Sequence, residues 1–370
     1  MSKITLKVGN DNGNSEHDII INNKLIKQPN VFAKVAKLPN LDEINKEYVL
    51  ENIQDNLIVS YEGGLYYIGQ NALKSGNRCR NIEVGVDNNK INSDIVFVNT
   101  IAQIAGFAVQ SKYTKDKEMD LIKIDVDMTT SLPVAYYNKK NANMFAEKFM
   151  EKKHKVNVFL GDEEISTEIK FTYVKVIPEG VTAMFSLIEN INKELENKRV
   201  LHIAIGEGTT EFPVTYGITF NPDFIDGTYN GVGQAIDSVI EDFKKQKGLL
   251  KFTRQDYSNV IKNPAHKYYD LAMEFIEPAI ENEAEDILHM AKKVIQKANN
   301  EIDYVCIYGG GSILMRNTLE PKLKIFCERA GIDICYLEND LAVTIESKGL
   351  YIFTESEIFK ALKENYNQKE

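Results

Sequence analysis

The sequence predicts a two-domain α/β protein in which a duplicated α/β core closes on a central cleft. The chain has 370 residues and 43% apolar content. That length is enough for about two domains of roughly 100–200 residues each. Both halves begin with the same succession of an apolar strand pattern, a glycine-bearing turn and a hairpin pattern. The halves are therefore expected to be variants of one α/β unit.

The first half is expected to form strands, a hairpin and two helices. Apolar residues alternate or cluster in stretches that we expect to be strands, namely 4–8, 18–22, 57–61, 65–68, 122–128, 155–159 and 169–176. Gly63-Gly64 marks a hairpin turn between the third and fourth of these. The expected helices cover 92–110 and 145–153. We expect the strand at 122–128 to end within 129–133, because Pro133 stops regular structure.

The pattern restarts in the second half with the buried-strand pattern of residues 200–204. Further strands are expected near 212–218, 224–225 and 304–308. A helix is expected through 235–243, followed by helical segments to about residue 300.

Composition and charge limit the kinds of function. No apolar run approaches the roughly 20 residues of a membrane span, and residues 1–3 lead directly into a strand pattern, so we expect a cytoplasmic protein with no membrane partner. The net charge of −10 argues against broad direct binding to DNA, which depends on neutralising phosphates. The four cysteines lack CxxC spacing and are expected to be reduced structural thiols.

Three glycine-bearing stretches, residues 10–15, 205–210 and 308–312, each follow an apolar run. In a turn after a buried strand, glycine lets backbone N–H groups approach an anionic ligand without a Cβ in the way. Asp11 stands at the first of these turns, and an acidic side chain beside phosphate-binding amides is the usual means of holding Mg²⁺. Together the stretches are expected to act as a split phosphate clamp.

Each feature also has a simpler structural interpretation. Residues 11–13 alone are typical of a hairpin turn. Glu179 alone is typical of the first turn of a helix, where the macrodipole favours a carboxylate. His202, flanked by apolar neighbours, is more typical of a buried core or cleft-edge histidine than of a catalytic base. The glycines at 309–311 are the least ambiguous, because so much backbone freedom is costly unless a ligand or close packing needs it.

Five segments in order resemble a known family. They are Asp11-Asn12-Gly13, Ser131-Leu132-Pro133-Val134, Ile177-Pro178-Glu179-Gly180, Ile205-Gly206-Glu207-Gly208-Thr209-Thr210 and Tyr308-Gly309-Gly310-Gly311-Ser312. Their order and strand contexts resemble the actin-like ATPases, specifically the ParM-type plasmid-segregation actins, over nearly the whole chain. The resemblance implies a two-domain actin-like fold around a nucleotide cleft, with 1–180 plus 338–370 as domain I and 181–337 as domain II.

The resemblance also implies roles for individual residues. The phosphate- and adenosine-binding set comprises Asp11, Asn12, Gly13, Asn14 and Ser15 in the first phosphate loop, Gly206, Glu207, Gly208, Thr209 and Thr210 in the second, and Gly309, Gly310, Gly311 and Ser312 on the adenosine side. Gly231 and Gly233, within 229–233, match the start of a helix that lines the nucleotide pocket. Asp11 is the expected metal ligand, and Glu179 matches the residue that orients the attacking water.

The second phosphate loop departs from the family's pattern. It usually opens Asp-x-Gly, and here Ala204 occupies the aspartate position. Without the carboxylate that helps hold metal-bound water, we expect slow hydrolysis, while amide contacts to phosphate survive. Either Glu207, Glu211 or Glu179 takes over this role, with Glu207 the next candidate, or the chain has been altered to trap a nucleotide state.

The first loop departs as well. The family tends to carry a lysine shortly after the glycine, and here residues 16–18 are Glu, His and Asp. The missing charge is expected to weaken phosphate binding unless Lys24, Lys34 or Lys37 folds back to replace it.

These observations predict an ATPase that binds ATP or ADP with Mg²⁺ and polymerises head to tail into filaments for plasmid DNA segregation, with hydrolysis driving disassembly. Its expected partners are further copies of itself and a basic DNA-binding centromere adaptor, so that plasmid DNA is contacted only indirectly. One alternative is a small-molecule kinase of the same ATPase superfamily, although the sequence shows no convincing acceptor-site motif. The other is a chaperone-like ATPase that does not polymerise.

Overall fold

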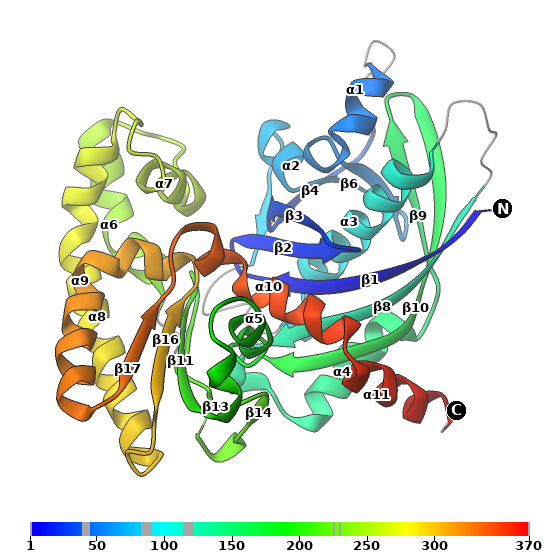
Figure 1. The fold of residues 1–370 in the computed structure, drawn as a ribbon. Helices are drawn as coiled ribbons and strands as arrows, with labels where there is room; N and C mark the ends of the chain where they lie inside the picture. The colour runs from blue at the N-terminus through cyan, green and yellow to red at the C-terminus, as the bar shows by residue number, and fades with distance from the viewer. Residues whose placement is uncertain are drawn as a thin grey trace. The chain divides into compact units, whose positions relative to one another are not determined.

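A computed structural model describes residues 2–38, 45–82, 90–113, 121–224, 226–228 and 231–368 of the chain. The protein divides into two compact units (Figure 1). The first unit comprises Met1–Leu132, Tyr136–Pro178 and Glu346–Glu370, and the second comprises Pro133–Ala135 and Glu179–Ile345. The predicted bounds of the two actin-like domains, 1–180 with 338–370 and 181–337, remain a prediction.

The first unit is built on one mixed sheet, in which the described strands follow the order β3-β2-β1-β8-β10-β9-β5-β6-β4-β7. These strands are β1 Ser2–Asn12, β2 Glu16–Ile21, β3 Lys24–Pro29, β4 Val31–Val35, β5 Ile58–Tyr61, β6 Gly64–Ile68, β7 Arg80–Asn81, β8 Ile122–Leu132, β9 His154–Leu160 and β10 Glu163–Pro178. The helices of this unit are α1 Lys46–Glu51, α2 Gln70–Lys74, α3 Asp94–Lys112, α4 Lys139–Met150, α11 Glu357–Asn367 and the end of α10 Asn339–Glu355.

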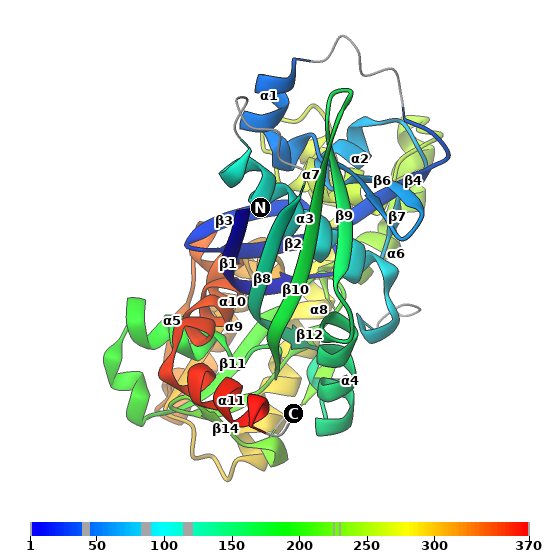
Figure 2. The ribbon, with the colours of Figure 1, turned by 90° about the vertical axis from the view of Figure 1, so that its right-hand side faces the viewer.

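Helices cover both faces of the central strands of this sheet (Figure 2). On one face, Leu6 and Val8 of β1 share a core with the apolar residues of α3, a helix that is buried over most of its length. On the other face, a Cβ added at Gly9 would lie 2.4 Å from the backbone nitrogen of Tyr351 in α10. The sequences of β1 and β8 alternate over 4–8 and 122–128 rather than forming apolar runs, because this second face also carries polar residues, such as Lys7 of β1 and Asp127 of β8.

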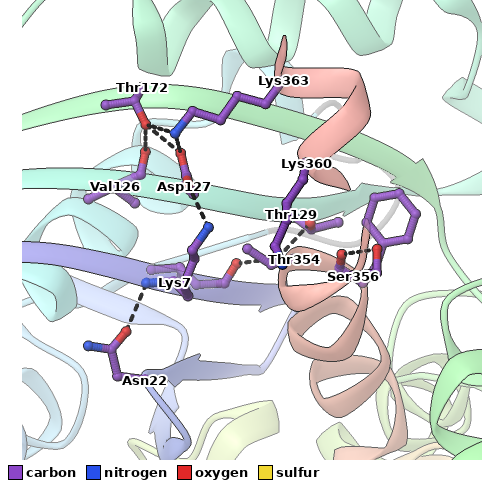
Figure 3. A network of polar contacts seen from close by, with 12 residues as sticks. Lys7, Asn22, Val126, Asp127, Thr129, Thr172, Thr354, Ser356, Lys360 and Lys363 are labelled. Atoms are coloured by element: carbon purple, nitrogen blue, oxygen red, sulfur yellow. Dashed lines mark hydrogen bonds and ion pairs between the residues drawn. The ribbon is translucent and has the colours of Figure 1, made fainter. Parts of the chain in front are cut away.

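A polar network attaches the C-terminal helix α11 to the second face (Figure 3). The buried carboxylate of Asp127 accepts hydrogen bonds from Lys7 at 2.7 Å and from Lys363 of α11 at 2.5 Å. Thr172 also donates to Asp127, and its hydroxyl accepts from Lys363 at 3.0 Å. Burial alone would raise the pKa of Asp127, but the hydrogen bonds from Lys363, Lys7 and Thr172 outweigh it and hold the pKa below its ordinary value.

The second unit contains a smaller sheet between two apolar cores. The parallel strands β11 Arg199–Ile205, β16 Tyr304–Tyr308 and β17 Asp333–Tyr336 form its centre, and the order β14-β13-β11-β12-β15 extends it through β12 Thr210–Glu211, β13 Val214–Tyr216, β14 Thr219–Phe220 and β15 Gly227–Thr228. The helices are α5 Ala183–Asn190, α6 Val232–Lys247, α7 Arg254–Ile261, α8 Tyr269–Lys297 and α9 Gly310–Ala330.

The side chains of β11 alternate between the two cores. Leu201, Ile203 and Ile205 lie in the core formed with α6, α8 and α9. Val200 and Ala204 pack in the core formed with α5. Side chains of a strand alternate with a period of two, so neighbouring residues of β11 lie in different cores.

The α/β class and most predicted elements are confirmed, and several boundaries were wrong. The end of the strand that covers 122–128 was predicted correctly: it lies at Leu132, directly before Pro133, after buried Thr129 and Thr130 pair with β1 and β10. The predicted helix 145–153 begins earlier, at Lys139, because the Asn138 side chain caps it by accepting from the Asn141 N–H.

Two strand predictions in the second half were also wrong. The stretch 212–218 is a strand only over Val214–Tyr216, because Gly217 turns the chain with a φ of 51°. At 224–225, Phe224 ends a short 3₁₀ helix, and Ile225 lies outside the described residues. Within the described part of the chain, no helix is both long and apolar enough to cross a membrane.

Candidate nucleotide-binding site

Three of the predicted ligand-binding segments meet at one edge of the second unit's sheet. β11 and β16 are parallel neighbours in which Ala204 lies beside Tyr308, so the turns that follow them leave the same edge. The first turn is closed by a 2.9 Å hydrogen bond from the Gly206 N–H to the Thr209 carbonyl. Helix α6 begins against this turn, since the Gly233 N–H donates to the Glu207 carbonyl at 2.8 Å. The structure thus brings together 206–210, 231–233 and 309–312.

Close packing explains why this edge needs glycine at several positions. A Cβ added at Gly309, whose φ is 97°, would lie 2.3 Å from the Ile205 carbonyl oxygen. A Cβ at Gly311 would lie 2.6 Å from the Ile205 side chain, and one at Gly231 would lie 2.5 Å from the Glu207 carbonyl oxygen. At Gly310, the first residue of α9, an added Cβ would meet no atom within 4 Å. Gly310 therefore faces open space at this edge.

The carboxylate of Glu207 faces an arginine of a neighbouring helix. Its carboxylate lies 3.8 Å from Arg254 of α7, and Arg254 also binds Asp237 of α6. Glu207 in turn lies against α6, because a Cβ at Gly233 would approach its Cγ to 2.8 Å. Arg254 and Asp237 were not predicted from the sequence, since no local pattern links residues 207, 237 and 254.

Glu211 lies directly opposite Ala204 on the neighbouring strand. The two residues are paired in the antiparallel ladder of β11 and β12, so their side chains share one face. Glu211 is buried and Ala204 is half-buried. A Cβ at Gly227 would lie 2.5 Å from Glu211 Oε2, so glycine at 227 leaves room for this carboxylate. Ala204 therefore has a carboxylate as its cross-strand neighbour.

The turn that carries Glu179 is fastened to the same face of the sheet. The Tyr308 hydroxyl donates to the Gly180 carbonyl at 2.8 Å and lies 3.1 Å from His202 Nδ1. His202 Nε2 lies 3.0 Å from the Thr215 hydroxyl. Since the Tyr308 proton goes to Gly180, His202 Nδ1 is assigned as the donor to Tyr308. Burial lowers the pKa of His202 to about 3, so it is a neutral, hydrogen-bonded core histidine.

In the first unit, Asp11 and Asn12 end β1, residues 13–15 lead into β2, and a buried asparagine network holds this first loop. The Asn30 side chain donates to the Gly13 carbonyl at 2.6 Å, and Asn99 of α3 donates to Asn30 at 2.7 Å. Asn12 donates to Thr100 of α3 at 2.9 Å. A Cβ at Gly13 would lie 2.7 Å from the Glu16 carbonyl oxygen. The first loop is therefore rigidly supported by Asn30, Asn99 and Thr100, which the sequence did not identify because they are far from the loop in the chain.

Two of the three lysines expected to fold back toward this loop are engaged elsewhere. Lys24 donates to Gln110 at 2.6 Å, and Lys34 lies over the Tyr66 ring. Lys90 is instead the buried cation near the loop, because its charge reaches His17, the cross-strand neighbour of Asn12. Burial, followed by the charge of Lys90, lowers the pKa of His17 to about 3. The expectation is therefore corrected for Lys24 and Lys34.

The acidic residues of the first loop suit a magnesium ion. Asp11 lies directly opposite Asp18 in the β1–β2 ladder, which places the two side chains on one face. Mg²⁺ is usually held by one or two carboxylates together with waters and ligand phosphates. The described residues contain no group of three or more metal-ligating side chains, and such a group is not required for an ion bound in this way.

Tyr229 and Asn230, which were expected at the pocket helix, lie outside the described residues.

Comparison with known proteins gives two domain matches. Residues 9–181 match the model of the actin-like proteins' N-terminal domain. Residues 202–321 match the model of the archaeal actin homologue MreB-like C-terminal domain. None of the curated proteins matches the sequence.

Solved structures of similar fold cover nearly the whole chain. The crystal structure of the actin-like protein Alp7A is 17% identical with a TM-score of 0.70, covering 99% of both chains. The archaeal actin homologue Ta0583 in complex with ADP is 16% identical with a TM-score of 0.65, covering 96% of this chain and 99% of that one. A 15-stranded ParM filament from Clostridium botulinum is 18% identical with a TM-score of 0.68, covering 96% and 99%. The chain is therefore an actin-like protein, with an actin-like N-terminal domain and an MreB-like C-terminal domain.

Proposed function

We propose that this protein binds ATP and ADP with Mg²⁺ through the first loop, 11–15, and through the turns at the edge of the second unit's sheet. We also propose that ATP binding drives its assembly into filaments. The observation that carries the proposal is the meeting of 206–210, 231–233 and 309–312 at the carboxyl edge of β11 and β16. Ligands of α/β sheets bind at the carboxyl ends of strands, where backbone N–H groups and helix N-termini favour phosphate. The ADP complex of Ta0583, which has the same fold, is consistent with this.

Different residues of the site would bind different parts of the nucleotide. Gly206, Gly208, Thr209 and Thr210 would bind phosphate through backbone N–H and hydroxyl groups, and Gly310 would leave room for the adenosine. Asp11 would hold the Mg²⁺, with Asp18 beside it. Bound Mg²⁺ would neutralise phosphate charge and polarise the transferred phosphoryl group. Asn14 and Ser15 complete the first loop, and Ser312 closes the third by donating to the Gly309 carbonyl at 2.8 Å.

Hydrolysis would depend on carboxylates around Ala204. Glu179 is the proposed water-orienting residue, and Tyr308 positions its turn by binding the next carbonyl. Of the residues weighed as substitutes for the missing aspartate, Glu211 is better placed than Glu207, because Glu211 shares a face with Ala204 while Glu207 is paired with Arg254. A longer side chain from the neighbouring strand would hold water less closely, so we expect hydrolysis to be slow.

The cellular role that we propose is plasmid segregation in the cytoplasm. A ParM of similar fold forms filaments, which supports self-association. With a net charge of −10, the polymer would contact plasmid DNA through a basic DNA-binding adaptor rather than directly. Hydrolysis would then weaken subunit contacts and drive disassembly.

A thermal-shift titration tests the nucleotide-binding part of the proposal. Mg-ATP and Mg-ADP should raise the melting temperature, because a ligand at about 100 times its Kd stabilises by roughly 2.7 kcal/mol. No shift at millimolar nucleotide would contradict the site. A shift with ATP combined with phosphorylation of a small metabolite would instead identify a kinase, and binding without assembly would identify a non-polymerising ATPase.

A further inference from the structure

Two of the four cysteines lie side by side in the sheet of the second unit. Cys306 of β16 and Cys335 of β17 are directly paired in the parallel ladder of these strands, which run next to each other in Figure 1. Both side chains pack in the core that contains α5, so they leave the same face of the sheet. All four cysteines of the chain are free thiols.

The pairing of Cys306 with Cys335 meets the geometric requirement of a disulfide. Neighbouring strands of a sheet lie about 4.8 Å apart, and the Cα atoms of most disulfides are separated by roughly 4.4–6.8 Å. Burial as a small apolar residue would explain either cysteine by itself. It does not require a second cysteine at the directly paired position and on the same face, whereas a bond between the two sulfur atoms does.

The two thiols differ in access and in acidity. Cys306 is fully buried, whereas Cys335 is half-buried on β17, which pairs only with β16 among the described strands and so forms an edge of the sheet. A hydrogen bond from the Cys306 thiol outweighs burial and lowers the pKa of Cys335, while that hydrogen bond and burial raise the pKa of Cys306. Because the thiolate is the reactive form of cysteine, Cys335 is the thiol that an oxidant would meet first.

We propose that Cys306 and Cys335 form a dithiol site that a hydroperoxide converts to a disulfide between β16 and β17. The Cys335 thiolate would attack one peroxide oxygen, the O–O bond would break, and the departing oxygen would take up a proton, which leaves a sulfenic acid on Cys335. The Cys306 sulfur would then attack the Cys335 sulfur and break its S–O bond, and the hydroxide released would leave as water with the Cys306 proton. Two thiols and one hydrogen peroxide thus give one disulfide and two waters.

The disulfide would lie next to the candidate nucleotide site. Tyr308, two residues after Cys306, donates to the Gly180 carbonyl at 2.8 Å. Tyr336, directly after Cys335, donates to the Ser312 carbonyl of the third glycine turn at 2.7 Å. The Cβ atoms of a disulfide are about 3.8 Å apart, which is closer than the spacing of two strands, so the bond would draw β16 and β17 together by about 1 Å.

A displacement of about 1 Å in the groups that position a ligand weakens their action substantially. We therefore expect the disulfide to weaken nucleotide binding at the third turn. This consequence rests on the proposed function, whereas formation of the disulfide does not.

Hydrogen peroxide added to the purified chain tests the bond itself. The unmodified chain should lose two of its four free thiols, and peptide mapping without reduction should recover a link between Cys306 and Cys335 that dithiothreitol removes. Cys335→Ser should form no link. Cys79→Ser, which changes a half-buried cysteine of the first unit, is the matched control and should keep the link.

The order of the two steps can be tested with Cys306→Ala. Without the second thiol, oxidation of Cys335 should stop at the sulfenic acid, which dimedone would capture. A peroxide-treated chain that keeps all four thiols, that links other cysteines, or that loses the link in Cys79→Ser would overturn the proposal. Absence of the dimedone adduct in a folded Cys306→Ala protein would overturn the assigned order of attack.

Thermal melting with Mg-ATP tests the consequence for binding. The oxidised chain should bind about tenfold more weakly, which would halve the ATP-induced shift measured at about 100 times the Kd of the reduced chain. Dithiothreitol should restore the full shift, and peroxide should not change the shift of Cys335→Ser. Equal shifts in the reduced and the disulfide-linked chain would overturn the effect on binding. A reduced chain without any ATP shift would contradict the nucleotide site, while peptide mapping would still decide whether the disulfide forms.

Discussion

Replacement of Gly310 separates nucleotide binding from folding. A Cβ at this position meets no protein atom within 4 Å, whereas one at Gly309 would lie 2.3 Å from the Ile205 carbonyl oxygen. In Gly310→Val, valine replaces glycine at the first position of α9, where its helix propensity is no worse. The stability of the nucleotide-free protein should therefore change by less than about 1 kcal/mol, or less than about 4 °C in melting temperature.

The branched side chain should, however, occupy the space proposed for the adenosine. The stabilisation of roughly 2.7 kcal/mol that ligand at about 100 times its Kd gives, equivalent to about 5–10 °C, should then disappear. Thermal melting with and without Mg-ATP measures both quantities on one sample. Gly309→Val is the contrasting variant, because its backbone clash and positive φ should lower the melting temperature even without nucleotide. A Gly310→Val protein that keeps the full ATP shift would refute the assignment of this turn to the nucleotide.

Three further predictions concern hydrolysis and stability. Ala204→Asp should speed phosphate release by at least about tenfold, since a water-orienting group contributes about a hundred- to ten-thousand-fold in rate. Glu179→Ala in that background should remove most of the gain. If the unmodified chain instead hydrolyses ATP rapidly and Glu211→Gln abolishes that activity, Glu211 already replaces the missing aspartate. Tyr308→Phe should slow phosphate release severalfold with little change in nucleotide affinity. Tyr257→Phe removes another buried hydroxyl bond of the same unit, so both variants should lose about 1–3 kcal/mol of stability, but Tyr257→Phe should leave phosphate release unchanged. Equal rates of release in both variants would contradict the positioning role of Tyr308. Because the pKa of Asp127 is held below its ordinary value in the folded state, its ion pairs should stabilise α11 above about pH 4, and this stabilisation should be lost as the pH falls through the folded pKa. Asp127→Asn should therefore abolish this part of the acid dependence of urea unfolding and increase hydrogen exchange in α11. An acid dependence that is unchanged in Asp127→Asn would argue against the network.

Local pattern was enough to predict the class of fold and the turns of the candidate site. The strand patterns at 4–8, 200–204 and 304–308 are β1, β11 and β16, and the glycine turns follow two of them at one edge. These signals are local. A strand buried on both faces demands an apolar run, as at 304–308, alternation as at 4–8 indicates a strand with one apolar face, and a close approach of backbone demands glycine. The same reasoning misplaced 212–218, where one positive-φ glycine ends the strand.

The supporting residues could not be predicted, because they depend on tertiary contacts. Asn30 and Asn99 reach the first loop from β3–β4 and α3, and Arg254 reaches Glu207 from α7. Nothing in the sequence places Glu211 opposite Ala204 until the register of β11 and β12 is known. Lys90 was likewise missed in favour of Lys24 and Lys34, since burial rather than proximity in the chain brings its charge to His17.

Electron microscopy of the purified chain with a non-hydrolysable ATP analogue and Mg²⁺ tests the central claim most directly. A nucleotide shifts assembly only by its differential affinity for the assembling state, so filaments should be abundant with the analogue, sparse with ADP and absent without nucleotide. Gly310→Val, which should fold but not bind, should form no filaments under any of these conditions. Monomers with every nucleotide, or filaments that form equally well without one, would contradict the account.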